Sequence, residues 1–125
     1  MHSPIFSLEV FPPKRTSPVG TIYDTLDGLQ GLDPDFISVT YGTGKSSDRT
    51  LTARIAHTIS KEYGIPAVAH LTALYSDKAK IDEALDMFED AGVSAVLALR
   101  ADYIDAEQPA GEFNYASDLV SYIRS

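Results

Sequence analysis

The sequence predicts an α/β protein of four successive βα units, which together make the N-terminal half of a (β/α)8 TIM barrel. Four short apolar, strand-forming runs alternate with segments of helical periodicity, and this alternation is typical of a parallel sheet. The last three runs are almost continuously apolar, as expected of strands buried on both faces. A small open doubly wound sheet also fits, but it usually has a fifth strand. Twice the 125 residues of the chain equals the roughly 250 residues of a complete barrel, which favours the half-barrel.

The expected strands are the apolar runs at 5–11, 36–40, 67–71 and 95–99. The first of them, IFSLEVF, is followed by Pro12 and Pro13, which end it because proline has no N–H group for the sheet ladder. Glu9 stands among the apolar residues of this strand. A carboxylate in that position belongs either to the solvent-exposed face of an edge strand or to a functional site.

Four helices are expected between and after these strands, at 18–31, 47–63, 76–91 and 115–124. Each carries apolar residues about one turn apart, which form a stripe that can pack on the sheet. Ser76 is the expected N-cap of the third helix. Gly64 and Gly92 follow the second and third helices and are expected to end them. Residues 103–114 are expected to form a long loop.

Charge and composition exclude several classes of function. The net charge of −8 argues against nucleic acid or an anionic membrane as a partner, because both require basic patches. The absence of cysteine excludes disulfides and thiolate chemistry and favours a cytoplasmic protein. No apolar run is long enough to span a bilayer, and no secretory signal is expected. His2, His57 and His70 lack metal-ligand spacing, so no metal site is predicted.

A polar residue lies at or near the end of each expected strand, in the order Glu9, Thr40, His70 and Arg100. The gaps of 31, 30 and 30 residues match one βα unit, so the four residues are expected at the same height. The carboxyl ends of parallel strands share one edge of a sheet, where ligands bind. The spacing therefore predicts a site at this edge. The alternative is that any regular βα repeat gives equal spacing without a shared function.

The stretch YGTGKSS at 41–47 ends like a phosphate-binding loop. The full pattern requires a glycine where this sequence has Val39, so the pattern is not met. The stretch is instead expected to be a glycine-rich turn into the helix that begins near Ser47. Backbone N–H groups at such a helix start could still bind an anion.

Two of the polar residues at the strand ends have two interpretations each. LRAD at 99–102 places Arg100 and Asp102 two residues apart, either as a solvated ion pair or as two charges directed at a ligand. AHLT at 69–72 places His70 inside an apolar strand. There it is either a hydrogen-bonded core residue or a residue of the site.

Six stretches together resemble the methylenetetrahydrofolate reductase family, flavin-dependent enzymes of one-carbon metabolism. They occur in the family's order and near its spacing, cover the chain almost end to end, and as a set are highly specific. They are SLEVFPPK (7–14), DFISVTYG (35–42), DRTL (48–51), PAVAHLT (66–72), LALRAD (97–102) and YASDLV (115–120).

The resemblance implies a (β/α)8 barrel with FAD at the carboxyl edge of its strands. In the family, NADH or NADPH passes hydride to the flavin and leaves, and the folate then takes its place. The reduced flavin converts 5,10-methylenetetrahydrofolate to 5-methyltetrahydrofolate, which serves methionine biosynthesis. The implied ligands of this chain are therefore FAD, a reduced nicotinamide cofactor and a folate.

The resemblance also implies roles for individual residues. Glu9 matches the general acid that helps to open the five-membered ring of the folate, and Asp102 matches an aspartate that lies near the flavin and tunes flavin and folate. The residues expected to line the FAD site are Thr40, His70, Arg100, Ala101, Asp102, Tyr115 and Ala116. Apolar neighbours disfavour an ionised carboxyl, so Glu9 is expected to keep a proton that it can donate. The forked guanidinium of Arg100 suits phosphate oxygens.

The sequence departs from the family pattern in two respects. Ala101 stands where the family usually has glycine, so its methyl group either crowds the flavin or requires a backbone angle that alanine disfavours. The chain also has only four of the eight βα units, and the other four normally supply much of the folate and nicotinamide pocket.

From the second departure, residues 1–125 are expected to be a partial domain, inactive without a C-terminal half. Its inner face and edge strands would be exposed, so it is expected to self-associate or to pair with a separate half. The alternative is a non-catalytic half-barrel that binds flavin or a partner chain, or a degenerate fragment.

Overall fold

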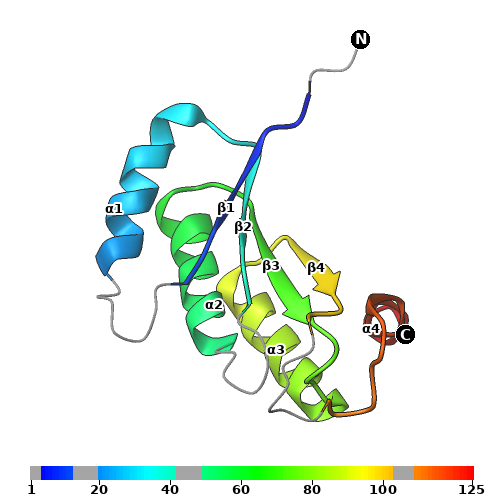
Figure 1. Ribbon diagram of the computed structural model, residues 1–125. Coiled ribbons are helices and arrows are strands. Elements are labelled where there is room, and N and C mark those ends of the chain that lie inside the picture. Colours follow the sequence, from blue (N-terminus) through cyan, green and yellow to red (C-terminus); the bar gives the residue numbers. More distant parts are fainter. Residues whose placement is uncertain (1–3, 13–19, 42–48, 103–108) are drawn as a thin grey trace.

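The computed structural model describes residues 4–12, 20–41, 49–102 and 109–125, and these residues form a parallel sheet with helices between its strands (Figure 1). The strands pair in the order β1-β2-β3-β4. They are β1 (Ser7–Val10), β2 (Phe36–Val39), β3 (Ala67–Thr72) and β4 (Ala95–Leu99). The α-helices are α1 (Gly20–Leu29), α2 (Arg49–His57), α3 (Lys78–Ala91) and α4 (Ala116–Ile123). The predicted α/β class with four βα units is confirmed, and the sheet has the form of half a barrel.

The helices cover one face of the sheet (Figure 1). On that face, side chains from β1 and β2 pack with α1 and α2 around the buried residues Leu26, Ile55 and Ile59. Side chains from β3 and β4 pack with α3 and α4 around Phe88 and Leu119. Burying each of these large apolar side chains contributes about 1.5–3 kcal/mol. This face therefore holds the core of the described residues.

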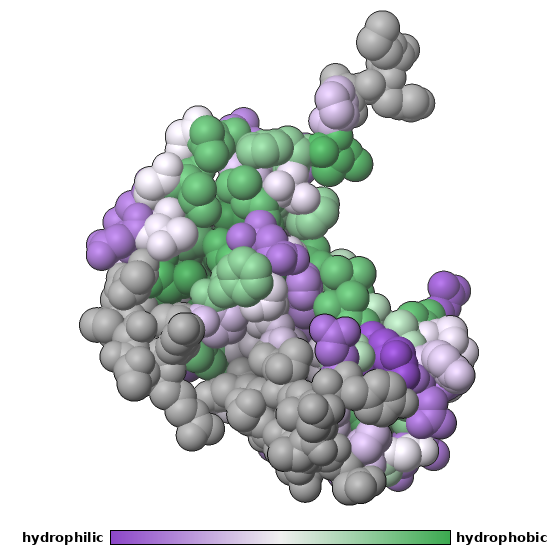
Figure 2. Space-filling model, viewed as in Figure 1, coloured by the Kyte–Doolittle hydropathy of each residue, from purple (hydrophilic) through white to green (hydrophobic). Residues whose placement is uncertain are grey.

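The opposite face of the sheet is concave and open. Figure 2 shows the molecule hollowed between the upper end of β1 and α4 at the lower right. Leu97 and Leu99 of β4 are 45% and 36% exposed on this side. The prediction that β4 is buried on both faces is therefore wrong, because no described element covers the concave face. The exposure expected of a half-barrel is observed.

The strands are staggered rather than level. Glu9 pairs with Ser38, two residues before Thr40, and His70 pairs with Leu97, three residues before Arg100. The prediction that equal sequence spacing puts the marked residues at one height is therefore wrong for Glu9 and Arg100, whereas Val39 pairs with Ala69 and leaves Thr40 and His70 level. Strands that tilt to close a barrel must shift in register from one to the next, and a regular unit length hides that shift.

The first strand is shorter than its apolar run. Ile5, Phe6 and Phe11 are 75%, 45% and 68% exposed, although the run 5–11 predicts a buried strand. Before Ser7, the backbone N–H of Phe6 donates to Asp35 Oδ2 at 2.7 Å and ties the incoming chain to the residue that precedes β2. The flanking apolar residues lie beyond the paired segment, where neither the helices nor the sheet covers them.

The helix boundaries follow capping chemistry with one correction. Asp77, not Ser76, caps α3, and its Oδ1 accepts from the backbone N–H of Lys80 at 2.8 Å. Ser76 is buried, and Asp77 has the extended backbone that an N-cap requires. Gly92 ends α3 with φ of 81°, and Gly64 follows the second helical segment with φ of 66°, as predicted.

Two of the α-helices are followed by a turn of another helical type. A 3-10 turn (Gln30–Leu32) follows α1, and a π-helical turn (Thr58–Glu62) follows α2. The predicted helix 47–63 thus begins, among described residues, at Arg49. The glycine-rich turn with Ser47, and residues 103–108 of the predicted loop, lie outside the described residues. No described helix has the length and apolar character needed to cross a membrane.

The Asp77 cap gives a first prediction. Asp77→Ala should lower the free energy of unfolding by about 1 kcal/mol, because the Lys80 N–H loses its acceptor. Asp77→Asn keeps an acceptor at the same place and is the matched control, with a much smaller loss. Urea unfolding followed by circular dichroism measures both. An alanine variant as stable as the wild type would show that this cap does not support α3.

Candidate active site at the carboxyl edge of the sheet

The side chains of Glu9 and His70 meet on the concave face. Oε1 of Glu9 lies 3.2 Å from Nε2 of His70, although β2 separates the strands that carry them. The β2 residue paired with Glu9 is the small Ser38, which pairs in turn with Val68, two residues before His70. A small side chain at this position leaves room for two longer ones to meet over it. The structure thus brings together two predicted site residues from β1 and β3.

The two partners differ in burial. The His70 side chain is 7% exposed, whereas the Glu9 side chain is 47% exposed. The expectation that apolar neighbours desolvate Glu9 is therefore wrong for this chain, because those neighbours lie on the helix side or outside the sheet. Burial lowers the pKa of His70, and the nearby Glu9 carboxylate opposes that shift. His70 is therefore a neutral imidazole at neutral pH.

The Nε2 atom of His70 is buried and has no hydrogen-bond partner among the described residues. The Glu9 oxygen is at ion-pair distance but is not oriented for a hydrogen bond. A buried polar atom left unpaired costs about 1–3 kcal/mol. A small rotation of Glu9, or a ligand on the concave face, would satisfy it.

A second group of predicted residues surrounds Arg100. Its Nε donates to the backbone carbonyl of Asn114 at 3.1 Å, and its guanidinium lies 5.9 Å from the centre of the Tyr115 ring. The backbone carbonyl of Arg100 accepts from the N–H of Leu74 at 3.0 Å, which fixes it to the turn after β3. Tyr115 immediately precedes α4, whose first residue is Ala116. The structure thus brings Arg100, Tyr115 and Ala116 together.

Two residues that support this second group were not found from sequence. Asp118 Oδ2 accepts from the backbone N–H of Tyr115 at 3.0 Å and from that of Asn114 at 3.2 Å, so it fixes the start of α4. An acidic residue in the first turn of a helix is a recognisable capping signal. Asn114 accepts from Arg100 through its backbone carbonyl. Every residue has such a carbonyl, so the sequence does not reveal this contact.

Ala101 has φ of 77°, in the left-handed region. Alanine disfavours this region because its Cβ approaches the following carbonyl. The residue is held there from its amino side, since the carbonyls of Leu99 and Arg100 accept from Ala73 and Leu74. Of the two expectations for Ala101, a disfavoured backbone angle is thus observed. The turn leads directly to Asp102, which is exposed.

The predicted residues therefore form two groups. Thr40 is half-buried beside the first, and its carbonyl accepts from Thr52 Oγ1 of α2 at 3.1 Å. Arg100 lies three residues past Leu97, the partner of His70, which is about 10 Å further along the strand direction. No cluster of three metal-binding side chains occurs in the described ranges.

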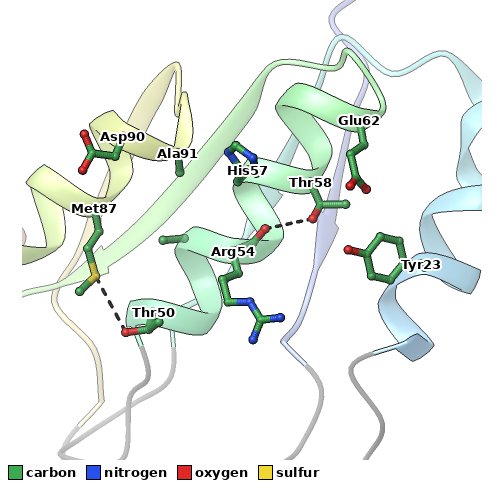
Figure 3. A pocket seen from close by; sticks show the side chains of 10 residues that line it. Tyr23, Thr50, Arg54, His57, Thr58, Glu62, Met87, Asp90 and Ala91 are labelled. Atoms are coloured by element: carbon green, nitrogen blue, oxygen red, sulfur yellow. Dashed lines mark hydrogen bonds between the residues drawn. The ribbon is translucent and has the colours of Figure 1, made fainter.

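Two hollows lie on opposite faces of the sheet. The concave face has one of about 670 Å³ toward the amino ends of the strands, where Asp35, Pro66 and Ser94 precede β2, β3 and β4, and Glu9 is the predicted site residue that lines it. The other, of about 470 Å³, lies among the helices and is lined in part by Arg54 and His57 (Figure 3). None of the predicted site residues lines this second hollow. The concave face is therefore the candidate active site.

Four parallel strands that alternate with helices are the repeating unit of a (β/α)8 barrel. The family model of methylenetetrahydrofolate reductase matches residues 1–125, the whole chain. The chain therefore belongs to the methylenetetrahydrofolate reductase family, and the resemblance drawn from its motifs is confirmed. Its fold is consistent with the N-terminal half of the family's TIM barrel.

Curated relatives give the same family. The chain is 37% identical over 124 residues to methylenetetrahydrofolate reductase 1 of Schizosaccharomyces pombe. The aligned residues make up 96% of this chain and 20% of the relative. It is 34% identical over 119 residues to 5,10-methylenetetrahydrofolate reductase of Pectobacterium carotovorum, covering 94% of this chain and 39% of the relative. A third relative, methylenetetrahydrofolate reductase (NADH) 1 of Arabidopsis thaliana, is 36% identical, covering 96% of this chain and 21% of the relative. The chain thus spans between about a fifth and two fifths of their length.

The strained turn gives a second prediction. Ala101→Gly should raise the free energy of unfolding by about 0.5–1 kcal/mol, because glycine adopts positive φ without the steric cost. The matched control is Ala98→Gly in β4, which should lower it by about 0.5–1 kcal/mol, since glycine weakens a strand. Urea unfolding measures both. If Ala101→Gly destabilises the chain as Ala98→Gly does, the turn is not strained.

Proposed function

We propose that this chain is the N-terminal part of a cytoplasmic enzyme that reduces 5,10-methylenetetrahydrofolate to 5-methyltetrahydrofolate. NADH or NADPH is the electron donor and FAD the carrier. The observation that carries the proposal is the position of Glu9. It is a half-exposed acid on the concave face, 3.2 Å from His70, in a chain that the family model matches over its whole length. A residue that only packs a sheet needs no carboxyl there.

The residues at the sheet edge fit FAD. Arg100 is exposed and offers the forked donor that phosphate oxygens require. The Tyr115 ring beside it is 63% exposed, which gives a flat apolar surface. When bound, the flavin supplies the hydride chemistry, and the protein supplies position and electrostatics.

In this proposal Glu9 is the proton donor. Its carboxyl reaches both solvent and the concave face, so it can give a proton to the folate and recover one from water. Protonation of a ring nitrogen weakens the adjacent carbon–nitrogen bond, and the five-membered ring opens to the iminium that accepts hydride. Such a positioned acid contributes about 10²–10⁴-fold to the rate. Asp102, carried by the Ala101 turn, is the second acid and is proposed to tune the flavin and the folate.

The concave face is proposed to be an internal surface of a complete barrel. Exposed Leu97 and Leu99 form the kind of apolar surface that further strands and helices would cover. We therefore treat residues 1–125 as a partial domain whose activity requires the remaining units. Without them, self-association through this face is the expected behaviour.

One observation favours a second candidate, a half-barrel that binds flavin or a partner chain without catalysis. The methyl group and strain of Ala101 fall next to Asp102, where a small change in backbone would displace that acid. The exposed Glu9 is not explained by this candidate, so it ranks second.

The third prediction concerns Glu9 in a completed enzyme. The chain is joined to the C-terminal part of the Pectobacterium relative, and folding is checked by a cooperative thermal transition. Glu9→Gln should reduce folate reduction by at least about 100-fold and leave NADH oxidation with an artificial electron acceptor nearly unchanged. Stopped-flow absorbance of the flavin measures the two half-reactions separately.

The matched control is Glu89→Gln, which makes the same chemical change at an exposed position of α3. It should leave both half-reactions unchanged. If Glu9→Gln also leaves both unchanged, Glu9 is not the acid. A folded, completed protein that neither binds FAD nor oxidises NADH would refute the proposed function as a whole.

A further inference from the structure

We infer that His70 is a positioning residue for Glu9. It holds the Glu9 carboxyl by a hydrogen bond both when the carboxyl is ionised and when it is protonated. The inference rests on the proposed role of Glu9. The expectation from sequence places His70 against FAD, whereas the geometry places its Nε2 atom 3.2 Å from Glu9 Oε1. A further polar contact to a ligand on the concave face is compatible with this role.

The two side chains have unequal freedom. His70 lies in an interior strand, paired with β2 and β4, and is 7% exposed. Glu9 lies in β1, at the edge of the described sheet, and is 47% exposed. A buried imidazole is fixed by packing, whereas a half-exposed glutamate retains several rotamers. His70 therefore sets the position of the carboxyl, and not the reverse.

A neutral imidazole can hydrogen-bond a carboxyl group in both its ionised and its protonated form. It has one N–H donor and one acceptor nitrogen, and their positions exchange between tautomers. With the proton on Nε2, it donates to ionised Glu9. With the proton on Nδ1, Nε2 accepts from protonated Glu9. One contact thus serves both states of the acid without placing a charge on His70, which burial disfavours.

Among the residues that the structure describes, Glu9 is the charged group that acts on His70. Across β4 its register partner is Leu97, and the β2 residues nearest the pair are Ser38 and Thr40. Asp35 lines the concave hollow but precedes β2, and its Oδ2 accepts from the backbone of Phe6 at 2.7 Å. A change at Glu9 should therefore be felt directly at His70.

The pairing can be tested on the chain without FAD or folate. Deuterium exchange at the Cε1 carbon of each histidine, followed by mass spectrometry across pH 4–9, gives separate pKa values whatever the state of association. His70 should titrate below the ordinary value of about 6.5. Glu9→Gln should lower its pKa further, since the carboxylate that favours the protonated imidazole is removed.

Two controls isolate the contact. The deuterium uptake of His57, on α2 and exposed, should be the same in the wild type and in Glu9→Gln. Glu89→Gln removes the same charge from α3 and should leave His70 unchanged. If Glu9→Gln does not shift His70, or if Glu89→Gln shifts it equally, the two side chains are not paired.

The positioning role is then tested in the completed barrel. His70→Leu should lower kcat for folate reduction by about 10-fold or more and shift the pH profile, while KM for the folate changes little. His70→Gln keeps a donor and an acceptor and should restore part of kcat. An unaltered pH profile in His70→Leu would overturn the role. Failure of the barrel to reduce folate would refute the proposed function alone, because the exchange measurement reports the pair independently.

Discussion

The structure depends on how the sheet is covered. Four parallel strands carry apolar residues on both faces, but helices bury only one of them in the described residues. The helix side therefore provides the stability, with Phe88 and Ile59 among its fully buried side chains. The concave side is open, and there Glu9 and His70 meet on the face that carries exposed Leu97. In a complete barrel the inner face is packed with side chains, and the active site lies at the carboxyl ends of the strands.

Much of the fold could be predicted from the sequence because its signals are local. Strand runs, helical stripes and the glycine that ends α3 act within a few residues, so they were found without tertiary information. Register is different, since it depends on strand tilt. The stagger that sets Glu9 against Ser38 is invisible in a regular spacing. Glu9 and His70 are two residues apart in register across β2, and their contact passes over the small Ser38, which the regular spacing does not reveal.

The proposed roles of the site residues come from the resemblance to the family, and the structure shows which of these residues lie together. It divides them into a pair on the concave face, buried His70 with half-exposed Glu9, and the guanidinium of Arg100, which donates to the carbonyl of Asn114. It also shows why Ala101 matters, because its positive φ lies at the turn into Asp102. The departure from glycine is thus a question of backbone conformation, and it affects the direction of Asp102.

The central claim is that the concave face is an internal surface of a barrel that continues beyond these four units. Hydroxyl-radical labelling with mass spectrometry tests it most directly, in the chain joined to the C-terminal part of the Pectobacterium relative. Leu97 and Leu99 should be strongly protected, while Tyr23, 40% exposed on the helix side, should be labelled freely. Labelling of Leu97 as strong as that of Tyr23 in the folded, joined protein would contradict the account.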